Sequence, residues 1–236
     1  MSVVALVPAA GRGERLGGSV PKALVPVRGE PLLVHAVRGL HLAGCVDAVV
    51  VAAPSSDVDT ARAALARAGV DALVVPGGTS RTHSVRLALA AAAAALDTVG
   101  PAEPSIVLVH DAARAFTPAE VIRAVVAAVA AGAPAIIPVL AVADTVKQVD
   151  AAGVVTGTPN RACLRVVQTP QGFAAETLRR AYAALAEDAE RAGADLTDDA
   201  GLVERLGVPV GTVPGHPHAM KITTPFDLAV AEAVLP

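Results

Sequence analysis

Short continuous runs of hydrophobic residues alternate, along the first 140 positions, with longer segments whose apolar residues recur at helical spacing. The runs cover residues 3–7, 48–53, 72–75, 106–109 and 135–140, and the helical segments cover residues 32–42, 58–68, 84–96 and 119–130. Continuous apolar runs are typical of strands that are buried on both faces. Glycines at 44, 69 and 132 follow three of the helical segments, and Pro118 precedes one. The alternation predicts an α/β fold with a Rossmann-like, doubly wound and mostly parallel sheet.

The pattern changes after residue 140. Segments 145–149 and 154–156 alternate like an exposed ribbon, and the residues between them form a plausible hairpin turn. Because a lone two-stranded hairpin is marginally stable in water, we expect residues 140–160 to form a projecting β-hairpin arm that packs against another surface, for example a second subunit. The α/β pattern then resumes with a strand at 164–168 and helices at 174–192, at 198–206 and from Pro225. Residues 1–236 are therefore interpreted as a single domain with an inserted arm at residues 140–160.

The composition excludes a disordered chain, since 53% of the residues are hydrophobic and 17% are charged. The longest uncharged run, residues 124–143, is nominally long enough to span a bilayer. Gly132, Pro134 and Pro138 interrupt it, so we interpret it as a helix end, a turn and a buried strand. The apolar N-terminus lacks a preceding basic segment, which argues against a signal peptide. We expect a cytoplasmic protein without a membrane partner.

Charge and aromatic content argue against a nucleic-acid partner. The net charge is −3, and aromatic residues make up 2% of the chain, so neither a positive field nor a stacking platform is evident. The two cysteines, Cys45 and Cys163, are too few and too far apart for a zinc cluster or a disulfide framework. We expect both to be reduced and buried.

A glycine-rich segment follows the first predicted strand and reads Pro-Ala-Ala-Gly-Arg-Gly-Glu-Arg-Leu-Gly-Gly from position 8 to position 18. Its glycines let backbone amides approach an anion closely, and Arg12, Arg15 and Lys22 add positive charge. The segment matches neither the dinucleotide fingerprint, because position 16 is leucine, nor the P-loop, because serine and valine follow Gly18. It predicts a different phosphate-binding loop at the carboxyl edge of the sheet.

Only three of the 19 basic residues are lysines, namely Lys22, Lys147 and Lys221. In a chain that otherwise uses arginine, the remaining lysines suggest positions that need a compact ammonium group. We predict that Lys22 and Lys221 act in the site. Lys147 is either part of the arm surface or functional, and the sequence leaves both interpretations open.

Other polar residues follow the predicted strands. Asp111 stands at a strand end, where its carboxylate could orient a divalent cation or a sugar hydroxyl, while His110 is interpreted as packing beneath the loop. The glycines at 77–78 form a second close-approach loop. Ser84 either caps the following helix or contacts a base, and residues 197–199 look like an acidic helix N-terminus.

Together these segments resemble the 2-C-methyl-D-erythritol 4-phosphate cytidylyltransferase family of the non-mevalonate isoprenoid pathway. The matching positions run in family order from the first strand to the last helix. They are 7–15, 21–22, 77–78, 81, 84–85, 107–114, 144–147, 161, 168–171, 197–198 and 221–223. Thr79 departs from the family pattern, in which we expect an acidic residue.

The resemblance implies an enzyme that forms 4-(cytidine 5'-diphospho)-2-C-methyl-D-erythritol and pyrophosphate from CTP and 2-C-methyl-D-erythritol 4-phosphate. Its cofactor would be Mg²⁺, held mainly by the triphosphate and close to Asp111. The implied catalytic residues are Arg15, Lys22 and Lys221. The implied CTP-binding residues are Pro8, Ala9, Ala10, Gly11, Gly13, Gly78, Ser84 and Asp111. The implied substrate-binding residues are Thr145, Arg161, Thr197, Asp111 and Arg114.

The resemblance also implies a homodimer with a shared active site, into which the arm of the second subunit carries Thr145 and Arg161. The nearest alternative is a cytidylyltransferase for another polyol phosphate, such as ribitol 5-phosphate, whose acceptor pocket should differ around Arg161 and Thr197. A non-catalytic nucleotide sensor would keep the glycine-rich loop, but Lys22 and Lys221 argue against it.

Overall fold

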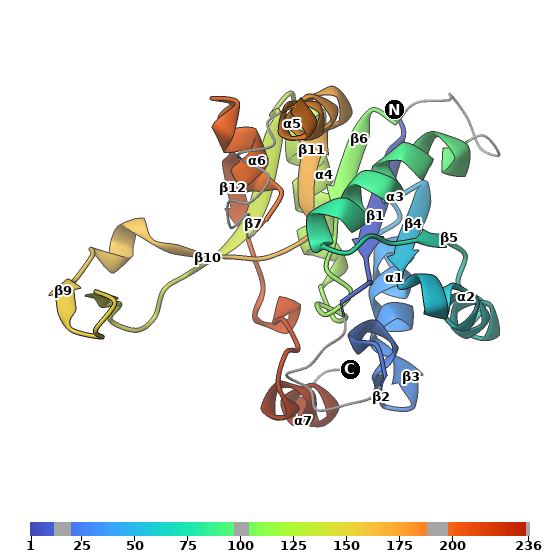
Figure 1. The fold of residues 1–236 in the computed structure, drawn as a ribbon, viewed down its shortest axis with the longest axis horizontal. Coiled ribbons are helices and arrows are strands. Elements are labelled where there is room, and N and C mark those ends of the chain that lie inside the picture. The colour runs from blue at the N-terminus through green and yellow to red at the C-terminus, as the bar shows by residue number, and fades with distance from the viewer. Residues whose placement is uncertain (12–19, 97–103, 188–197, 235–236) are drawn as a thin grey trace.

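A mixed β-sheet forms the centre of the molecule (Figure 1). The computed structural model describes residues 1–11, 20–96, 104–187 and 198–234. Within these residues, eight strands form the central sheet in the order β10-β7-β11-β6-β1-β4-β5, and β12 pairs with β7 off this path. The strands are β1 (Val3–Pro8), β4 (Ala48–Ala53), β5 (Leu73–Pro76), β6 (Ile106–Val109), β7 (Ala135–Ala141), β10 (Arg165–Val167), β11 (Gln171–Ala174) and β12 (Gly211–Pro214).

Most strand pairs in this sheet are parallel. Strand β1 pairs in parallel with β4 and β6, β4 pairs with β5, and β12 pairs with β7. Strands β10 and β11 run antiparallel to their neighbours. Strands β11 and β12 are not predicted from the sequence, because neither is an apolar run. In β11, a Cβ atom at position 172 would lie 2.4 Å from Val125 Cγ1, so the packing requires glycine there. Strand β12 begins with Gly211 and ends with Pro214.

Helices cover both faces of the sheet. They are α1 (Leu32–Leu42), α2 (Val58–Arg67), α3 (Arg81–Leu96), α4 (Ala119–Ala130), α5 (Ala175–Glu187), α6 (Ala200–Arg205) and α7 (Pro225–Val234). Helices α1, α2 and α4 share one hydrophobic core, and α3, α5 and α6 share the other. Along β1, Ala5 packs into the first core while Val4 and Leu6 pack into the second. Both faces of the strand are therefore buried, and the doubly wound prediction is confirmed.

Within the described residues, the predicted helix boundaries agree with the structure to within a few residues, and the end of the helix predicted at 174–192 lies outside them. Helices α1 and α4 have the predicted bounds, whereas α3 begins three residues before the predicted position 84. The earlier start has a local cause, because the Ser80 hydroxyl accepts a hydrogen bond from His83 N at 3.0 Å and caps the helix. Gly44 and Gly69, with φ of +69° and +64°, follow the ends of α1 and α2 as predicted.

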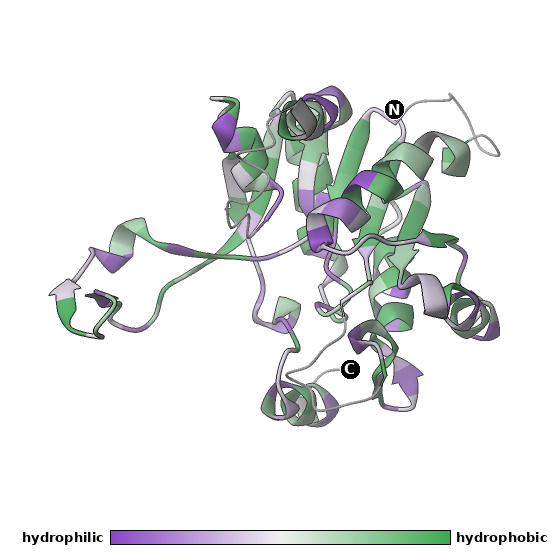
Figure 2. Cartoon of the chain, viewed as in Figure 1, coloured by the Kyte–Doolittle hydropathy of each residue, from purple (hydrophilic) through white to green (hydrophobic). Residues whose placement is uncertain are grey.

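The uncharged run 124–143 folds as the end of α4, a turn and the buried strand β7. Figure 2 shows β7 mostly in green. In the described part of the chain, no helix is both long and apolar enough to cross a membrane. The cytoplasmic location stays a prediction.

A small satellite core lies at the opposite end of the molecule from the α5–α6 pair (Figure 1). It joins α7 to the short strand β2 (Pro26–Val27), which pairs with β3 (Glu30–Pro31). Its buried members include Val27, Leu32 and Ile222. This packing places the segment before α7 against the main body.

The segment between β7 and β10 leaves the main body as an arm (Figure 1). Its two strands, β8 (Gln148–Val149) and β9 (Val155–Gly157), form a separate two-stranded sheet; β8 is shorter than predicted, and β9 is shifted by one residue. Val149, Val154 and Val155 are 56%, 61% and 55% exposed, because the arm has no core of its own. Cys163, expected to be buried, is exposed on the arm for the same reason. The dimerising role of the arm stays a prediction.

Candidate active site

Two backbone loops meet at the carboxyl edge of the sheet, one after β1 and one after β5. Ala9 N donates to Ala52 O at 2.8 Å, and Gly77 N donates to Ala53 O at 2.6 Å. A Cβ at Gly77 would lie 2.9 Å from the Cβ of Ala10, closer than two carbon atoms normally approach. Glycine thus allows the loops to touch at the edge where open α/β sheets bind their ligands.

The glycine-rich segment begins at Pro8, the last residue of β1, and Lys22 follows it in the chain. Lys22 N donates to Gly11 O at 3.3 Å, and Lys22 begins a short 3₁₀ turn, η2 (Lys22–Leu24). The two ends of the loop therefore lie together, with Lys22 beside Gly11. The predicted site residues Gly13, Arg15 and Thr197 lie outside the described residues.

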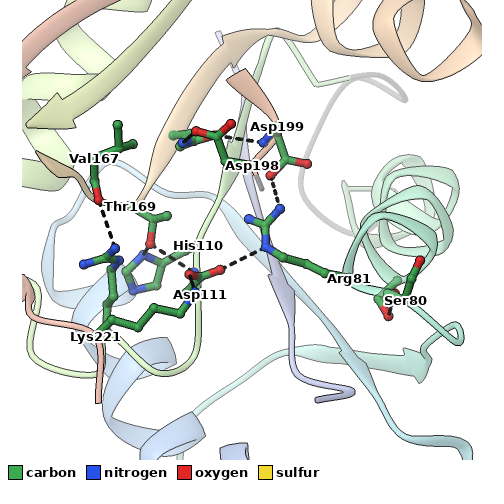
Figure 3. A network of polar contacts seen from close by, with 12 residues as sticks. Ser80, Arg81, His110, Asp111, Val167, Thr169, Asp198, Asp199 and Lys221 are labelled. Atoms are coloured by element: carbon green, nitrogen blue, oxygen red, sulfur yellow. Dashed lines mark hydrogen bonds and ion pairs between the residues drawn. The ribbon is translucent and has the colours of Figure 1, made fainter. Parts of the chain in front are cut away.

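Asp111 follows β6 and lies between two cations (Figure 3). Lys221 Nζ is 2.7 Å from its Oδ2, and Arg81 Nε donates to its Oδ1 at 3.2 Å. Burial by itself would raise the pKa of Asp111, but the charges of Arg81 and Lys221 outweigh burial and hold this pKa below its ordinary value. The site therefore contains a charged carboxylate at neutral pH, with an ammonium group within hydrogen-bonding distance.

Arg81 connects Asp111 to a second buried carboxylate. Its Nη1 donates to Asp199 Oδ2 at 2.6 Å, and the Tyr182 hydroxyl donates to Asp199 Oδ1 at 2.5 Å. Burial raises the pKa of Tyr182, and the charge of Asp199 raises it further, so the phenol remains a donor. Burial would lower the pKa of Arg81, but Asp199 and Asp111 raise it above its ordinary value. The network therefore links α3, the loop after β6, α5 and the start of α6.

Gln171 fixes the start of α6 within this network. Its Oε1 accepts from Asp199 N at 3.2 Å and from Ala200 N at 3.0 Å, while its Nε2 donates to Asp198 Oδ2 at 2.8 Å. Asp198 Oδ1 accepts from Gly201 N at 3.1 Å and so caps α6, as the sequence suggests. The structural role of Gln171 is not predicted from the sequence, although Gln171 lies in the family motif at 168–171.

The position of Lys221 is set by its neighbours in the chain. Ile222 is fully buried in the satellite core, and its amide donates to Ala113 O at 2.9 Å. Asp227 Oδ2 accepts from Thr223 N and Thr224 N, each at 2.8 Å. Burial would raise the pKa of Asp227, but these hydrogen bonds lower it to about 2. The backbone on the C-terminal side of Lys221 is thus anchored, whereas its side chain is 42% exposed.

His110 is linked to the backbone of Asp111 through the hydroxyl of Thr169. Asp111 N donates to Thr169 Oγ1 at 3.0 Å, and the same hydroxyl lies 3.0 Å from His110 Nδ1. Because this hydroxyl accepts the amide proton, it can donate its own proton to a neutral imidazole ring. Burial lowers the pKa of His110 to about 4, which keeps the ring neutral. The interpretation of His110 as a packing residue beneath the loop is confirmed.

The stability of the protein is expected to fall between pH 7.5 and pH 5 because of His110. In the unfolded chain a histidine takes up its proton near pH 6.5, whereas in the folded protein it does so at about pH 4. The unfolded state binds more protons between these values, so the free energy of unfolding decreases as the pH falls. We expect Tm to drop by roughly 5 °C over this range, and by less in His110→Asn. Equal pH slopes in the two proteins would contradict this assignment.

Ser84 is fully buried and holds the glycine loop at residues 77–78. Gly78 N donates to Ser84 Oγ at 3.1 Å, and the Ser84 hydroxyl donates to Ser80 O at 2.8 Å. Of the two interpretations of Ser84, the helix cap is wrong, since Ser80 caps α3. The predicted contacts of Ser84 and Gly78 with cytosine stay predictions.

Arg114 joins the base of the arm to the segment that leads to Lys221. Its Nη1 donates to Ala219 O at 2.7 Å and its Nη2 to Val167 O at 3.0 Å. Its Nε is buried without a hydrogen-bond partner among the described residues. Arg114 thus holds the backbone at Ala219 next to the end of β10. Its contact with the substrate stays a prediction.

Two other predicted substrate residues lie on the arm. Thr145 is exposed, and Arg161 donates to Ala143 O within the same arm. Lys147 Nζ lies 2.7 Å from Thr158 Oγ1 and links the two sides of the arm. Figure 1 shows the arm extending away from the central sheet, so the single chain does not bring Thr145 and Arg161 to Asp111.

The sheet topology and the loops at its carboxyl edge define an α/β protein with a nucleotidyltransferase-like fold. A family model described as 2-C-methyl-D-erythritol 4-phosphate cytidylyltransferase matches residues 3–236. The chain belongs to this family, and the resemblance inferred from its motifs is confirmed.

Individual relatives agree with the family assignment over the whole chain. The 2-C-methyl-D-erythritol 4-phosphate cytidylyltransferase of Saccharopolyspora erythraea is 64% identical over 235 residues, with 100% of both chains covered. The crystal structure of the enzyme of that name from Thermus thermophilus is 36% identical, with a TM-score of 0.77 over 99% of this chain and 98% of that one. The 4-diphosphocytidyl-2C-methyl-D-erythritol synthase of Anaerococcus prevotii is 26% identical, with a TM-score of 0.79 over 98% and 97%.

Proposed function

We propose that this protein transfers the cytidylyl group of CTP to 2-C-methyl-D-erythritol 4-phosphate, releasing pyrophosphate, in the biosynthesis of isoprenoid precursors. Membership of the family supports the reaction and both substrates. The structural observation that carries the proposal is the Lys221–Asp111 pair, 2.7 Å apart, beside two glycine loops at the carboxyl edge of the sheet.

The chemistry needs positive charge more than a general base. The acceptor phosphate is already ionised at neutral pH, so attack on the α-phosphorus of CTP requires in-line positioning and stabilisation of the charge on the transferring group. Lys22 and Lys221 would supply ammonium groups on the two sides of that phosphorus, with Arg15 beside the departing pyrophosphate. The pyrophosphate carries away the bonding electrons of the broken P–O bond, and no proton has to be removed from the attacking oxygen.

The backbone of the two loops would bind the nucleotide. Pro8, Ala9, Ala10 and Gly11 would line the triphosphate, and the loop at residues 77–78 would face the base. The close contact between Gly77 and Ala10 supports this arrangement, because it places the two loops side by side. Backbone amides in such loops form concave anion-binding surfaces.

The residues present fit a Mg²⁺ ion that is carried by the triphosphate. The described residues contain no cluster of three or more His, Cys, Asp or Glu side chains that could hold a metal alone. Mg²⁺ in nucleotide sites is commonly bound by one or two carboxylates together with substrate phosphates. Asp111 is the carboxylate at this edge that would hold it. The ion would supply charge neutralisation for the phosphates.

The arm would complete the site of a second subunit. Thr145 and Arg161 lie on a hairpin that extends away from its own body, and three exposed valines give the hairpin an apolar surface. A homodimer in which each arm reaches the partner's acceptor site accounts for both observations. Exposed apolar side chains of this kind are typical of interaction surfaces.

The proposed function is tested by pyrophosphate release from CTP with either of two acceptors. With Mg²⁺ present, 2-C-methyl-D-erythritol 4-phosphate is expected to support rapid release and ribitol 5-phosphate little or none. Excess EDTA should stop the reaction and added Mg²⁺ should restore it. A clear preference for ribitol 5-phosphate would contradict the acceptor, and nucleotide binding without release would contradict catalysis.

A further inference from the structure

Arg81, the first residue of α3, bridges two carboxylates from distant parts of the chain. Its Nε contacts Asp111 at 3.2 Å and its Nη1 contacts Asp199 at 2.6 Å (Figure 3). A planar guanidinium offers several N–H donors in fixed directions, so it can hold two carboxylates at once, which a single ammonium group does less well. Arg81 is therefore suited to hold Asp111 and Asp199 in a fixed relative position.

The carboxylate of Asp111 forms ion pairs with both Arg81 and Lys221. Asp111 is mostly buried, with 11% of its side chain exposed, whereas Lys221 is 42% exposed. If Lys221 turned from Asp111 to a substrate phosphate, the carboxylate would be left without its closest ammonium group. A buried charge that loses its partner is strongly destabilised. A second cation that stays in place removes most of this cost, and Arg81 occupies that position.

Arg81 is itself held in place by groups that belong to the protein core. Asp199 is 1% exposed and accepts from the Tyr182 hydroxyl at 2.5 Å. The backbone amide of Asp199 is bound by Gln171, which is fully buried. Arg81 is therefore fixed on its far side, whereas Lys221 extends from an anchored backbone into a more open environment.

We propose, on the basis of the function proposed above, that Arg81 is a positioning residue which keeps Asp111 in place and charge-compensated while Lys221 moves from Asp111 to a substrate phosphate. Without Arg81, Lys221 is the main partner of Asp111 and is less available to the phosphate. Removing Arg81 should therefore lower kcat, because the ammonium group of Lys221 is needed most in the transition state. The binding of CTP in the ground state should change little.

The test uses the double variant Arg81→Gln/Asp199→Asn of the full chain. Both replacements keep planar polar groups of similar size, and removing both charges leaves neither carboxylate nor guanidinium buried alone at this contact. We expect a Tm within a few degrees of wild type, a CTP Kd by calorimetry within about twofold, and a kcat lower by at least about tenfold. A kcat within about twofold of wild type would overturn the inference.

Tyr182→Phe is the matched control, because it removes a hydrogen bond from Asp199 without changing any charge. We expect a lower Tm but a kcat within about twofold of wild type. If Tyr182→Phe lowered kcat as much as the double variant does, the decrease in kcat would result from disturbed packing and not from the lost charge of Arg81. That result would contradict the inference.

A third variant keeps the inference testable if the double variant does not fold. In Arg81→Lys the ammonium group can reach Asp111 or Asp199 but not hold both, so kcat should again fall with little change in CTP affinity. Wild-type kcat in this variant would overturn the inference while the proposed function stands. A wild-type protein that transfers no cytidylyl group at all would instead overturn the proposed function, and this inference with it.

Discussion

Replacing Lys221 with alanine is expected to lower kcat by roughly 10²–10³, the usual effect of removing one donor to a transition-state charge. The ammonium group lies 2.7 Å from Asp111 and is 42% exposed, so it can turn toward a bound phosphate. Its backbone is anchored by Ile222, so the replacement should leave the fold intact. Arg81 remains next to Asp111 in the variant and limits the loss of stability.

The measurement is steady-state kcat and KM for both substrates, together with Tm. Lys221→Arg keeps the charge but spreads it over a larger planar group, and we expect it to restore only part of the rate. Arg62→Ala, which removes an exposed cation paired with Asp59 on α2, serves as a surface control with wild-type kinetics. Wild-type kcat in Lys221→Ala would show that the ammonium group takes no part in the transfer.

Replacing Arg161 with alanine is expected to lower kcat/KM for the acceptor by roughly 10², because an arginine can bind a phosphate through two parallel hydrogen bonds. Arg161 lies on the arm, away from the Asp111 network of its own chain. If each site combines Lys22 of one subunit with Arg161 of the other, a heterodimer of Arg161→Ala and Lys22→Ala chains contains one intact site and one doubly defective site.

The heterodimer is obtained by co-expressing the two chains with different tags and purifying on both. From the symmetry of a two-site dimer, it should recover about half of the wild-type activity, whereas each parental variant stays nearly inactive. A heterodimer no more active than the mixture of its parents would place Lys22 and Arg161 in the same subunit's site. A wild-type protein that is monomeric at assay concentration would also contradict the shared site.

The parts of the fold that depend on local pattern could be predicted from the sequence. Strands β1, β4 and β6 are apolar runs because both of their faces are buried, and the glycines after α1 and α2 end those helices with positive φ. The glycine-rich loop and the scarcity of lysine likewise pointed to Lys22 and Lys221. These signals are local, so a single sequence contains them.

The contacts of the site could not be predicted in the same way. Arg81 and Asp199 are 118 positions apart, and nothing in either local sequence indicates that they form an ion pair. Tyr182 and Gln171 contribute through hydrogen bonds that exist only after α5 and α6 have packed on the sheet. Ser84 has two plausible local interpretations, and the structure adds a third, because its hydroxyl holds Gly78.

The contact between Tyr182 and Asp199 gives the unmodified protein an optical signal at the centre of its polar network. The chain has one tyrosine, three phenylalanines and no tryptophan, so Tyr182 dominates its intrinsic ultraviolet emission. A phenol hydroxyl that donates to a carboxylate emits weakly, and Tyr182 donates to Asp199 at 2.5 Å. Any rearrangement that separates Asp199 from Tyr182 should therefore increase this emission, so the Tyr182–Asp199 contact can be followed in real time without a label.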